Sequence, residues 1–410
     1  MKEFLRKILK WKLRVFAKLI LWKYQPGIIG ITGSVGKTSA KEAIHTVLRN
    51  IRNVRVSRGN FNNEIGLPLT ILGHWDKVGS WGFWCKVFFV SALRLIFRMD
   101  YPELLVLEYG ADRPGDLKYL LDIAKPQIGV ITAIGDIPVH VEFYNSPDAV
   151  AREKGYLIEA LMSAGFAILN YDDEAVLAMK ERTRAHIVTY GFDEGAELRI
   201  TNFQNRMEGD RPEGISFKLE YGGSFVPVRL DDCFGKAQAY AAAIAAAVGL
   251  AFGINLVKIA EALTYYQAPS RRMKLIAGIK GSYIIDDSYN ASPLAMRAAL
   301  DTLKSLGKVR KIAVLGDMLE IGKYTLGAHE ALGELAGKFL DILVTVGPRA
   351  KFIAEAANNA GLAKKNIFSF DEAEEAKRKV QELIKKGDLI LVKASRAIGL
   401  DKIVEEIRQI

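Results

Sequence analysis

A glycine-rich segment near the start of the chain constrains the fold more than any other feature. Residues 30–39 read GITGSVGKTS, directly after an apolar run at 28–32 and directly before a helical stretch from about 37 to 49. Glycines let the backbone curl so that its N–H groups face phosphate oxygens, and the start of a helix adds positive potential. The order of strand, glycine-rich loop and helix predicts an α/β domain that binds a nucleoside triphosphate.

The chemistry expected of this loop follows from its side chains. Lys37 would reach the β- and γ-phosphates, and the Thr38 hydroxyl would bind Mg²⁺. The strict G-x-x-x-x-G-K-[ST] pattern is not met, because Ile31 stands five residues before Gly36. A packing turn is the alternative, but Gly-Lys-Thr in this setting favours the nucleotide. The predicted ATP-binding residues of the loop are Gly33, Ser34, Val35, Gly36, Lys37, Thr38 and Ser39.

An apolar run at 104–107 ends in Glu108, within LLVLEYGADRPGD, and supplies a second candidate metal ligand. An acidic side chain at the end of a neighbouring strand is typically needed to hold the nucleotide's Mg²⁺. A carboxylate here could equally cap a loop. Glu108 is therefore predicted as a magnesium ligand, with the structural alternative left open.

The rest of the chain alternates short apolar runs with helical stretches, as in an α/β protein. Residues 196–231 change to β-rich alternation, and APSRRMK at 268–274 is typical of a linker into a second α/β unit. We predict a helix within 1–26, a central domain at 27–267 and a C-terminal domain at 268–410. Strands are expected at 104–107, 128–132, 283–286, 311–315, 342–346 and 389–392, and helices at 149–164 and 237–250.

The net charge of +10 is concentrated in one short segment. Residues 1–24 carry eight lysines and arginines against Glu3, so the other 386 residues carry only +3. A nearly neutral body argues against nucleic-acid binding, since duplex-binding domains usually show a basic face within the fold. The two cysteines, Cys85 and Cys233, are too few for a disulfide scaffold or a four-thiolate metal site. They indicate a reducing compartment, and we expect a cytoplasmic protein.

The basic N-terminal segment has the pattern of an amphipathic helix. It contains neither the ~20-residue uncharged run of a membrane span nor the apolar core of a signal peptide. An interfacial helix at the inner face of the cytoplasmic membrane and a helix packed on the body both remain open. One side carries Phe4, Leu5, Ile8, Leu9, Trp11, Val15, Phe16, Leu19, Ile20 and Trp22, and the other carries Arg6, Lys7, Lys10, Arg14 and Lys18.

A second aromatic segment runs from Trp81 to Arg98, with Lys86 and Arg94 on one side of the expected helix. The basic residues argue against a membrane span. Lipid contact by residues 79–99 is left open, and a helix in the protein core is slightly favoured.

Eight motifs in order over residues 27–410 resemble the Mur ligase family, ATP-dependent amide ligases of cell-wall peptide synthesis. DDSYNASP and LGDMLEIG are most similar to the MurF branch, which adds D-alanyl-D-alanine to a UDP-N-acetylmuramoyl-tripeptide. The resemblance implies a P-loop ATPase domain with a parallel-rich sheet flanked by helices, followed by a Rossmann-like α/β domain. The motifs are ITGSVGKTS at 31–39, GNFNNEIGLPLT at 59–70, LEYGADRPGD at 107–116, His140 followed by AREKGYL at 151–157, SRRM at 270–273, DDSYNASP at 286–293, LGDMLEIG at 315–322 with His329 downstream, and VKASR at 392–396.

The same resemblance implies two Mg²⁺ ions and a catalytic set of Lys37, His140 and Lys154. Thr38 and Glu108 would hold the first ion, and His140 with a carbamylated Lys154 would hold the second. Carbamylation turns an ammonium into an oxygen ligand, which a hard cation prefers. Outside the motif order, Lys154 is typical of an exposed helix lysine and His140 of a loop histidine with its hydrogen bonds made.

Further roles come from the resemblance alone. Asn62 and Asn63 would lie near the reacting phosphate and acyl group. The nucleotide would be bound by Arg272, Asp287 and Asn290, and the phosphate region or the incoming amine by Lys393, Ser395 and Arg396. A basic loop capping the next helix is the alternative for VKASR. ATP would phosphorylate a carboxylate on a muramoyl-peptide acceptor, and an amine such as that of D-Ala-D-Ala would displace phosphate.

Three features depart from the family pattern. The UDP-sugar domain that usually precedes the phosphate loop is expected to be missing, because this loop begins at residue 30. Ala237, Gln238 and Ala241 replace the residues usually near adenine, and 75–99 is typical of an insertion. A pseudomurein-type, poly-γ-glutamate or folylpolyglutamate ligase therefore remains an alternative, as does a membrane-surface P-loop ATPase that forms no bond.

Overall fold

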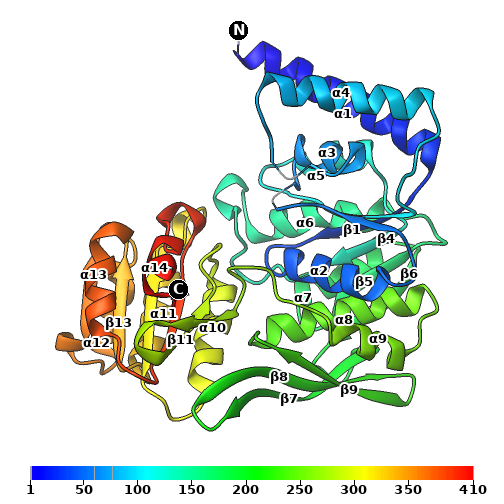
Figure 1. The fold of residues 1–410 in the computed structure, drawn as a ribbon. Coiled ribbons are helices and arrows are strands. Elements are labelled where there is room, and N and C mark those ends of the chain that lie inside the picture. The colour runs from blue at the N-terminus through cyan, green and yellow to red at the C-terminus, as the bar shows by residue number, and fades with distance from the viewer. Residues whose placement is uncertain (1, 60, 76, 410) are drawn as a thin grey trace. The chain divides into compact units, whose positions relative to one another are not determined.

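The computed structural model describes residues 2–59, 61–75 and 77–409 (Figure 1). Asn60, within the motif at 59–70, lies outside them. The chain forms two compact units. The first contains the chain up to Ala133 together with Asp148–Arg199 and Ala241–Ala262; the second contains Ile134–Pro147, Ile200–Tyr240 and Leu263–Ile410. The predicted boundary near residue 267 stays a prediction.

The first unit is built on a parallel sheet of strands in the order β2-β3-β1-β4-β5-β6, with the start of β7 beside β6. β1, β3 and β4 are buried along almost their whole length, as expected for strands covered on both faces. The strands are β1 (Gly27–Thr32), β2 (Val54–Val56), β3 (Leu104–Glu108), β4 (Ile128–Ile131), β5 (Phe166–Asn170) and β6 (His186–Gly191). Of β7 (Leu198–Glu208), only the first two residues belong to this unit. The helices include α2 (Lys37–Leu48), α3 (Gly66–Leu72), α5 (Asp116–Ile123), α6 (Pro147–Glu159), α7 (Glu174–Leu177), α8 (Lys236–Ala251) and α9 (Leu256–Leu263).

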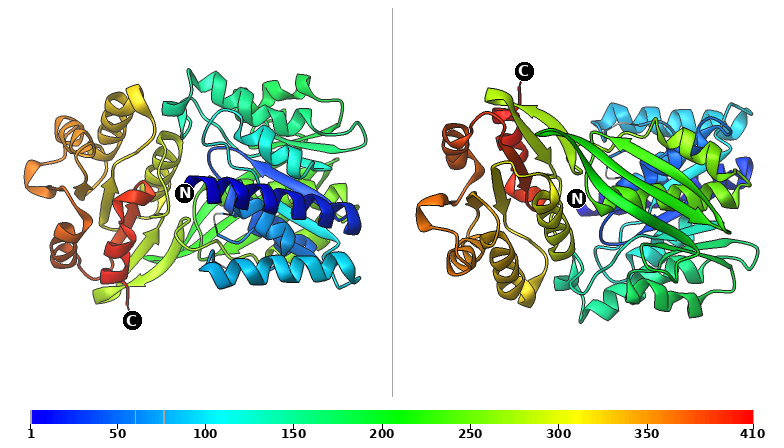
Figure 2. Two further views of the ribbon diagram at one scale, coloured as in Figure 1. Left: turned by 90° about the horizontal axis from the view of Figure 1, so that it is seen from above. Right: turned by 90° about the horizontal axis from the view of Figure 1, so that it is seen from below.

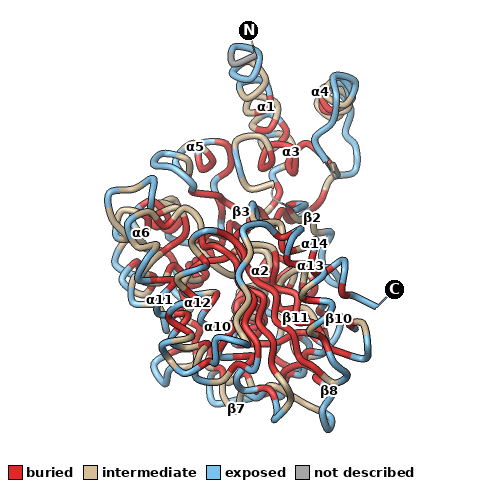
Figure 3. Tube along the Cα trace, turned by 90° about the vertical axis from the view of Figure 1, so that its left-hand side faces the viewer, coloured by how far each residue is buried: buried red, intermediate tan, exposed pale blue. Residues whose placement is uncertain are grey.

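Two further helices, α1 (Lys2–Tyr24) and α4 (Trp81–Ile96), form an outer layer of this unit. α1 packs on α3 and α5, and α4 lies beside α1 (Figures 1 and 2). Figure 3 shows most of α4 as exposed or intermediate, and only Val87 and Ser91 of this helix are buried. The prediction of a core helix here is therefore wrong. Among the described residues no helix is both long and apolar enough to cross a membrane.

α1 was expected either to lie at a membrane interface or to pack on the body, and its buried residues decide between these two only in part. Leu13, Ala17 and Ile20 are fully buried, so the helix packs on the body. Its basic residues, however, do not all face water. Arg6 and Lys10 pair with Glu64, and Arg14 and Lys18 pair with Asp122.

The second unit contains a sheet in the order β10-β11-β15-β12-β13-β14, in which only the β10–β11 pair is antiparallel. Ile312, Val314, Val344 and Ile390 are fully buried in its core. The predicted Rossmann-like α/β character is confirmed. The elements are the hairpin β8 (Arg211–Tyr221) and β9 (Ser224–Asp231), the strands β10 (Lys274–Gly278), β11 (Ser282–Asp286), β12 (Lys311–Gly316), β13 (Ile342–Val346), β14 (Ile367–Phe370) and β15 (Leu389–Lys393), and the helices α10 (Pro293–Ser305), α11 (Thr325–Gly337), α12 (Lys351–Asn359), α13 (Ala373–Leu383) and α14 (Asp401–Ile407).

A buried ion pair joins the ends of two neighbouring strands in this unit. Lys393 Nζ lies 2.6 Å from Asp287 Oδ2 and donates to the Asn290 carbonyl at 2.9 Å. Both side chains are nearly inaccessible to water, and burial raises the pKa of Asp287 while Lys393 opposes that rise. By contrast, Lys351 and Asp371 form a pair of 2.7 Å whose side chains are about half exposed or more.

The Lys393–Asp287 and Lys351–Asp371 pairs have nearly the same N–O distance but differ in burial, so together they test how burial changes the contribution of an ion pair to stability. Lys393→Met leaves the buried Asp287 carboxylate without its ion-pair partner, so we expect it to lower the free energy of unfolding by about 3–5 kcal/mol. Lys351→Met breaks an exposed pair and should cost only about 0–1 kcal/mol. Denaturant titration of both variants and the parent measures the difference. Equal losses would contradict the burial of Lys393.

Candidate active site

The phosphate loop follows β1 and requires glycine at two places. Gly33 has φ of +142° and Gly36 has φ of +92°, both in the region that favours glycine. A Cβ atom at Gly33 would also lie 2.0 Å from Thr132 Oγ1. Any larger residue would push the loop away from the sheet.

The loop is held by hydrogen bonds to the neighbouring strand end and to itself. The Ser34 and Val35 amides donate to the Ala133 carbonyl at 2.7 and 3.1 Å, so in this structure they are engaged with the protein. Lys37 Nζ donates to the Gly33 carbonyl at 2.7 Å, which folds its side chain back over the loop. Ser34 Oγ is buried and has no hydrogen-bond partner among the described residues. A buried unpaired hydroxyl beside the start of α2 fits a phosphate ligand.

Glu108 lies at the same edge of the sheet as the loop. Parallel pairing sets Ile31 opposite Glu108, one residue before the end of β1. The Glu108 side chain is buried, and its Oε1 lies 3.0 Å from Lys41 Nζ. Lys41 also donates to the Ser57 carbonyl at 2.6 Å. A carboxylate with one oxygen paired retains Oε2 for a cation, so a hydroxyl at Thr38 and a carboxylate at Glu108 suit Mg²⁺ in donor chemistry.

Sequence reasoning missed Lys41. Its place one helical turn after Lys37 resembles an ordinary exposed helix lysine, yet the side chain is almost fully buried. Only the pairing of β1 with β3 reveals that α2 brings an ammonium to Glu108.

Lys154 lies on α6 and is buried, contrary to the exposed-lysine alternative. Burial, with a further contribution from the nearby Lys37 charge, lowers its pKa to about 7, while Asp112 and Glu153 act in the opposite direction. The neighbouring Glu153 accepts from the Gly115 and Leu117 amides at 3.0 Å each and so ties α6 to the start of α5. A neutral amine near the phosphate loop is thus accessible at ordinary pH.

The two asparagines before α3 have clear structural contacts. Asn63 Oδ1 accepts from the Ile65 and Gly66 amides at 3.1 and 2.9 Å and caps α3, while its side chain also lines a pocket. The Asn62 carbonyl accepts from the Gly110 amide at 2.7 Å. Both residues therefore lie against the segment that follows β3.

His140 belongs to the second unit and has a left-handed backbone with φ of +70°. Its Nδ1 lies 2.8 Å from Glu320 Oε2. With Nδ1 held by a carboxylate, Nε2 is the ring atom through which such a histidine binds a metal. His140 was predicted as a metal ligand, and that role stays a prediction.

Several predicted residues of the second unit gather around one aromatic ring. The Arg272 guanidinium lies 3.9 Å from the centre of the Tyr289 ring and that of Arg396 lies 5.8 Å from it. Tyr289 stands between Asp287 and Asn290, so the Asp287–Lys393 pair and both arginines lie in one neighbourhood. Tyr289 lies within the motif at 286–293, but nothing in the sequence distinguishes it from an aromatic residue of the core.

Ser395 and Gln238 are engaged inside the second unit. Ser395 Oγ accepts from the Leu319 amide at 2.9 Å. Gln238 is buried, donates to the Arg272 carbonyl at 2.8 Å and accepts from the Tyr266 hydroxyl at 2.7 Å. His329 is likewise buried between the Met318 amide and the Thr325 carbonyl, and burial lowers its pKa. These contacts are structural.

Family models match both parts of the chain. The model described as Mur ligase middle domain matches residues 31–78 and 90–249, and that described as Mur ligase, glutamate ligase domain matches residues 271–396. The interruption at 79–89 falls within the segment expected to be an insertion.

Named relatives agree with the family models. The chain is 32% identical over 397 residues to the UDP-N-acetylmuramoyl-tripeptide--D-alanyl-D-alanine ligase of Bacillus subtilis, covering 96% of this chain and 79% of the relative. It is 33% identical over 400 residues to the enzyme of that name from Mycobacterium tuberculosis, covering 92% and 72%.

Solved structures are similar over nearly the whole chain. The MurF ligase of Thermotoga maritima in complex with ADP has a TM-score of 0.80 and 27% identity, covering 97% of this chain and 83% of that one. A pseudomurein peptide ligase from Methanothermus fervidus, 19% identical with a TM-score of 0.65, shares the fold. The predicted family and fold class are confirmed: the chain belongs to the Mur ligase family.

Proposed function

We propose that this chain is an ADP-forming ligase that joins a carboxylate of a muramoyl-peptide acceptor to the amine of D-Ala-D-Ala. The observation that carries the proposal is the convergence of Lys37, Glu108 and Lys154 on the end of β1 within the first unit. The names of the relatives from Bacillus subtilis and Mycobacterium tuberculosis support this choice of substrates.

The proposed reaction has two steps. A carboxylate oxygen of the acceptor attacks the γ-phosphorus of ATP, and the bond to the leaving ADP oxygen breaks. The amine nitrogen then attacks the acyl carbon, the C–O bond to phosphate breaks, and the nitrogen loses its proton as the amide forms. Lys37 stabilises charge on the transferring phosphoryl group, and Gly36–Ser39 orient the phosphates through the start of α2.

Metal ions would be held mainly by oxygen donors, which hard cations prefer. Thr38 and Glu108 would hold Mg²⁺, which neutralises phosphate charge when it is bound. A second ion would be held by His140 and a carbamylated Lys154. Carbamylation requires an amine lone pair to attack CO₂ with loss of one proton, and a buried Lys154 with its pKa lowered to about 7 supplies that neutral amine.

The remaining predicted residues are proposed as substrate contacts. Asn62 and Asn63 would adjoin the acyl phosphate, and Arg272, Asp287 and Asn290 would bind the nucleotide. The incoming amine or phosphate would be bound by Lys393, Ser395 and Arg396. The packing of Tyr289 against Arg272 and Arg396 supports a shared binding surface.

We also propose that the enzyme works at the inner face of the cytoplasmic membrane, with α1 and α4 lying on anionic lipid. Trp11, Trp22 and Trp81 are 62%, 76% and 81% exposed. Their neighbours on the same two helices and the turn after α4 include the exposed Phe4, Leu19, Phe89, Ile96 and Phe97.

Charge next to this apolar surface favours an anionic partner. Lys7, Lys12, Lys86 and Arg98 are exposed on or just after the same helices. Exposed tryptophans flanked by lysines are typical of interfacial helices, which bury an apolar face among lipid headgroups.

Lys37→Ala tests the phosphoryl-transfer step. We expect amide formation and acceptor-dependent ADP release to fall at least about 100-fold, because the γ-phosphoryl group loses its fixed positive charge. Coupled ADP release with ATP, Mg²⁺, D-Ala-D-Ala and a UDP-linked muramoyl-tripeptide measures it. The exposed Lys258→Ala serves as the matched control. Turnover of ATP by the parent that is indifferent to acceptor and amine would instead identify an ATPase that makes no bond.

Carbamylation of Lys154 predicts a dependence on CO₂. With ¹³C-labelled bicarbonate, the parent should give a carbamate carbon signal that Lys154→Ala lacks, and CO₂-free buffer should lower the ligase rate reversibly. Because the amine gains a proton below about pH 7, the signal should weaken as the pH falls through that value. The exposed Lys180→Ala is the control. A parent without the signal and with equal rates in both buffers contradicts the carbamate.

Membrane contact is tested by co-sedimentation with vesicles of phosphatidylglycerol or phosphatidylcholine. The parent should bind anionic vesicles more strongly, and Trp11→Ser/Trp22→Ser should bind clearly less because two of the three exposed tryptophans named above are removed. Tyr265→Ser/Phe225→Ser, which changes exposed aromatic residues elsewhere, should bind like the parent. Loss of a dimer in the tryptophan variant, with no vesicle binding by the parent, would assign the surface to a second copy.

A further inference from the structure

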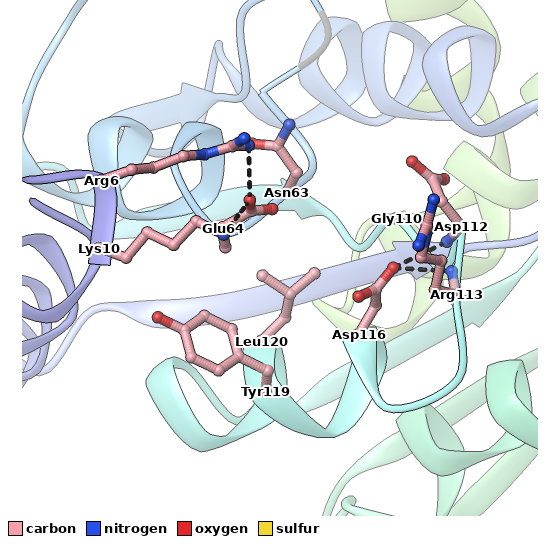
Figure 4. A pocket seen from close by; sticks show the side chains of 10 residues that line it. All are labelled: Arg6, Lys10, Asn63, Glu64, Gly110, Asp112, Arg113, Asp116, Tyr119 and Leu120. Carbon is pink, nitrogen blue, oxygen red and sulfur yellow. Dashed lines mark hydrogen bonds and ion pairs between the residues drawn. The ribbon is translucent and has the colours of Figure 1, made fainter. Parts of the chain in front are cut away.

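A pocket of about 660 Å³ lies within the first unit, between α1 and the segments that follow β2 and β3 (Figure 4). Pockets of this size commonly hold part or all of a small ligand. Four parts of the chain meet there, namely α1, the loop before α3, the loop after β3 and α5. Its lining is Arg6, Lys10, Asn63, Glu64, Gly110, Asp112, Arg113, Asp116, Tyr119 and Leu120.

Two cations from α1 share one carboxylate on the upper wall of this pocket as Figure 4 shows it. Lys10 Nζ lies 2.6 Å and Arg6 Nη2 lies 3.3 Å from Glu64 Oε1. Burial alone would raise the pKa of Glu64, but the bonds with Lys10 and Arg6 lower it, so this carboxylate stays ionised. Two positive groups against one negative group leave this wall with one excess positive charge. Asp112 and Asp116 lie elsewhere in the lining and outweigh Arg113 there, so an anion is favoured only at the α1 side of the pocket.

The opposite wall is held in place by a short network. Asp116 Oδ2 accepts from the Arg113 amide at 2.8 Å and from the Asp112 amide at 3.2 Å, which fixes the loop after β3. The side chain of Arg113 adds a third cation to the lining. The loop geometry is therefore set before a ligand arrives.

This wall also lies close to the reacting groups. Asp112 is near enough to Lys154 to oppose the lowering of its pKa, and Gly110 follows Glu108 by two residues. Asn63, a predicted substrate residue, lies in the same lining. Asp112 and Asn63 therefore connect the lining of the pocket with the neighbourhood of Lys154 and with the predicted substrate residues.

We propose that this pocket binds the acceptor and that Arg6 and Lys10 of α1 hold its phosphate groups. The proposal rests on the proposed ligase function and names the part of the chain that recognises the acceptor's charged end. The substrate in the relatives' names carries a diphosphate, which a guanidinium and an ammonium recognise well. The diphosphate can belong to a soluble nucleotide or to a membrane lipid, and the chemistry of this wall is the same for both.

The test is direct binding of the acceptor to the full chain by titration calorimetry. One arm uses UDP-N-acetylmuramoyl-tripeptide, and the other uses the same muramoyl-tripeptide on a prenyl diphosphate in nanodiscs. We expect Arg6→Ala and Lys10→Ala each to weaken acceptor binding about tenfold and the double variant more, with ATP affinity unchanged.

Arg14→Ala is the matched control, because Arg14 also joins α1 to the body by an ion pair, with Asp122, but does not line the pocket. Lys258→Ala removes an exposed lysine of another helix in the same unit. Both should bind the acceptor within about twofold of the parent. Melting temperatures of all variants report whether α1 stays docked.

Each outcome decides the proposal. Weaker binding confined to Arg6→Ala and Lys10→Ala supports it, and the arm that shows the effect identifies the carrier of the diphosphate. Equal losses in Arg14→Ala, or no acceptor binding by a parent that binds ATP, overturn it. Acceptor that binds as expected but is never joined to an amine would refute the ligase function and leave the pocket assignment standing.

Discussion

Parallel pairing of β1 with β3 is the constraint on which the rest of the site depends. It sets Ile31 beside Glu108, so that a glycine-rich loop and a buried carboxylate leave the sheet at one edge. The helix that follows the loop then brings Lys41 to that carboxylate at 3.0 Å. In an open α/β sheet, ligands bind at the carboxyl ends of the strands. The position of the site therefore follows from strand order before any side chain is considered.

The same edge explains why lysines dominate the candidate chemistry. Lys37 and Lys41 are one helical turn apart on α2, and Lys154 approaches from α6. Burial of Lys154, with a further contribution from the Lys37 charge, lowers its pKa to about 7. A triphosphate would supply the negative charge that this arrangement lacks.

Much of the fold could be predicted from sequence because its signals are local. The strands at 342–346 and 389–392 are short apolar runs, and the structure has them at Ile342–Val346 and Leu389–Lys393. The helix expected at 149–164 ends at Glu159, since a boundary depends on how the following turn packs.

The sequence predicted part of the candidate site, and it predicted the surroundings of α1 and α4 less well. The reason is that these features depend on contacts between residues distant in sequence. Loop glycines and Glu108 stand in a recognisable order along the chain, whereas Lys41, Tyr289 and Glu64 matter only through partners distant in sequence. Periodicity gave the two faces of α1 but not which face meets the body. That choice depends on Glu64 and Asp122, which no local pattern identifies as partners. For α4 a place in the core was slightly favoured over lipid contact, because no local pattern distinguishes an apolar helix that is buried from one that is exposed.

The ion pairs of α1 have a consequence for the order in which the protein can fold during synthesis. Lys10 and Lys18 leave the ribosome well before Glu64 and Asp122, so the helix has neither of these carboxylates to dock on until α3 and α5 exist. Until then both sides of the helix are exposed to solvent: the side with Leu13 and Ile20, which is buried in the folded protein, and the side with Trp11, which stays exposed. A nascent chain in this state is exposed to premature association, and its protection depends on how fast the next hundred or so residues are translated and folded.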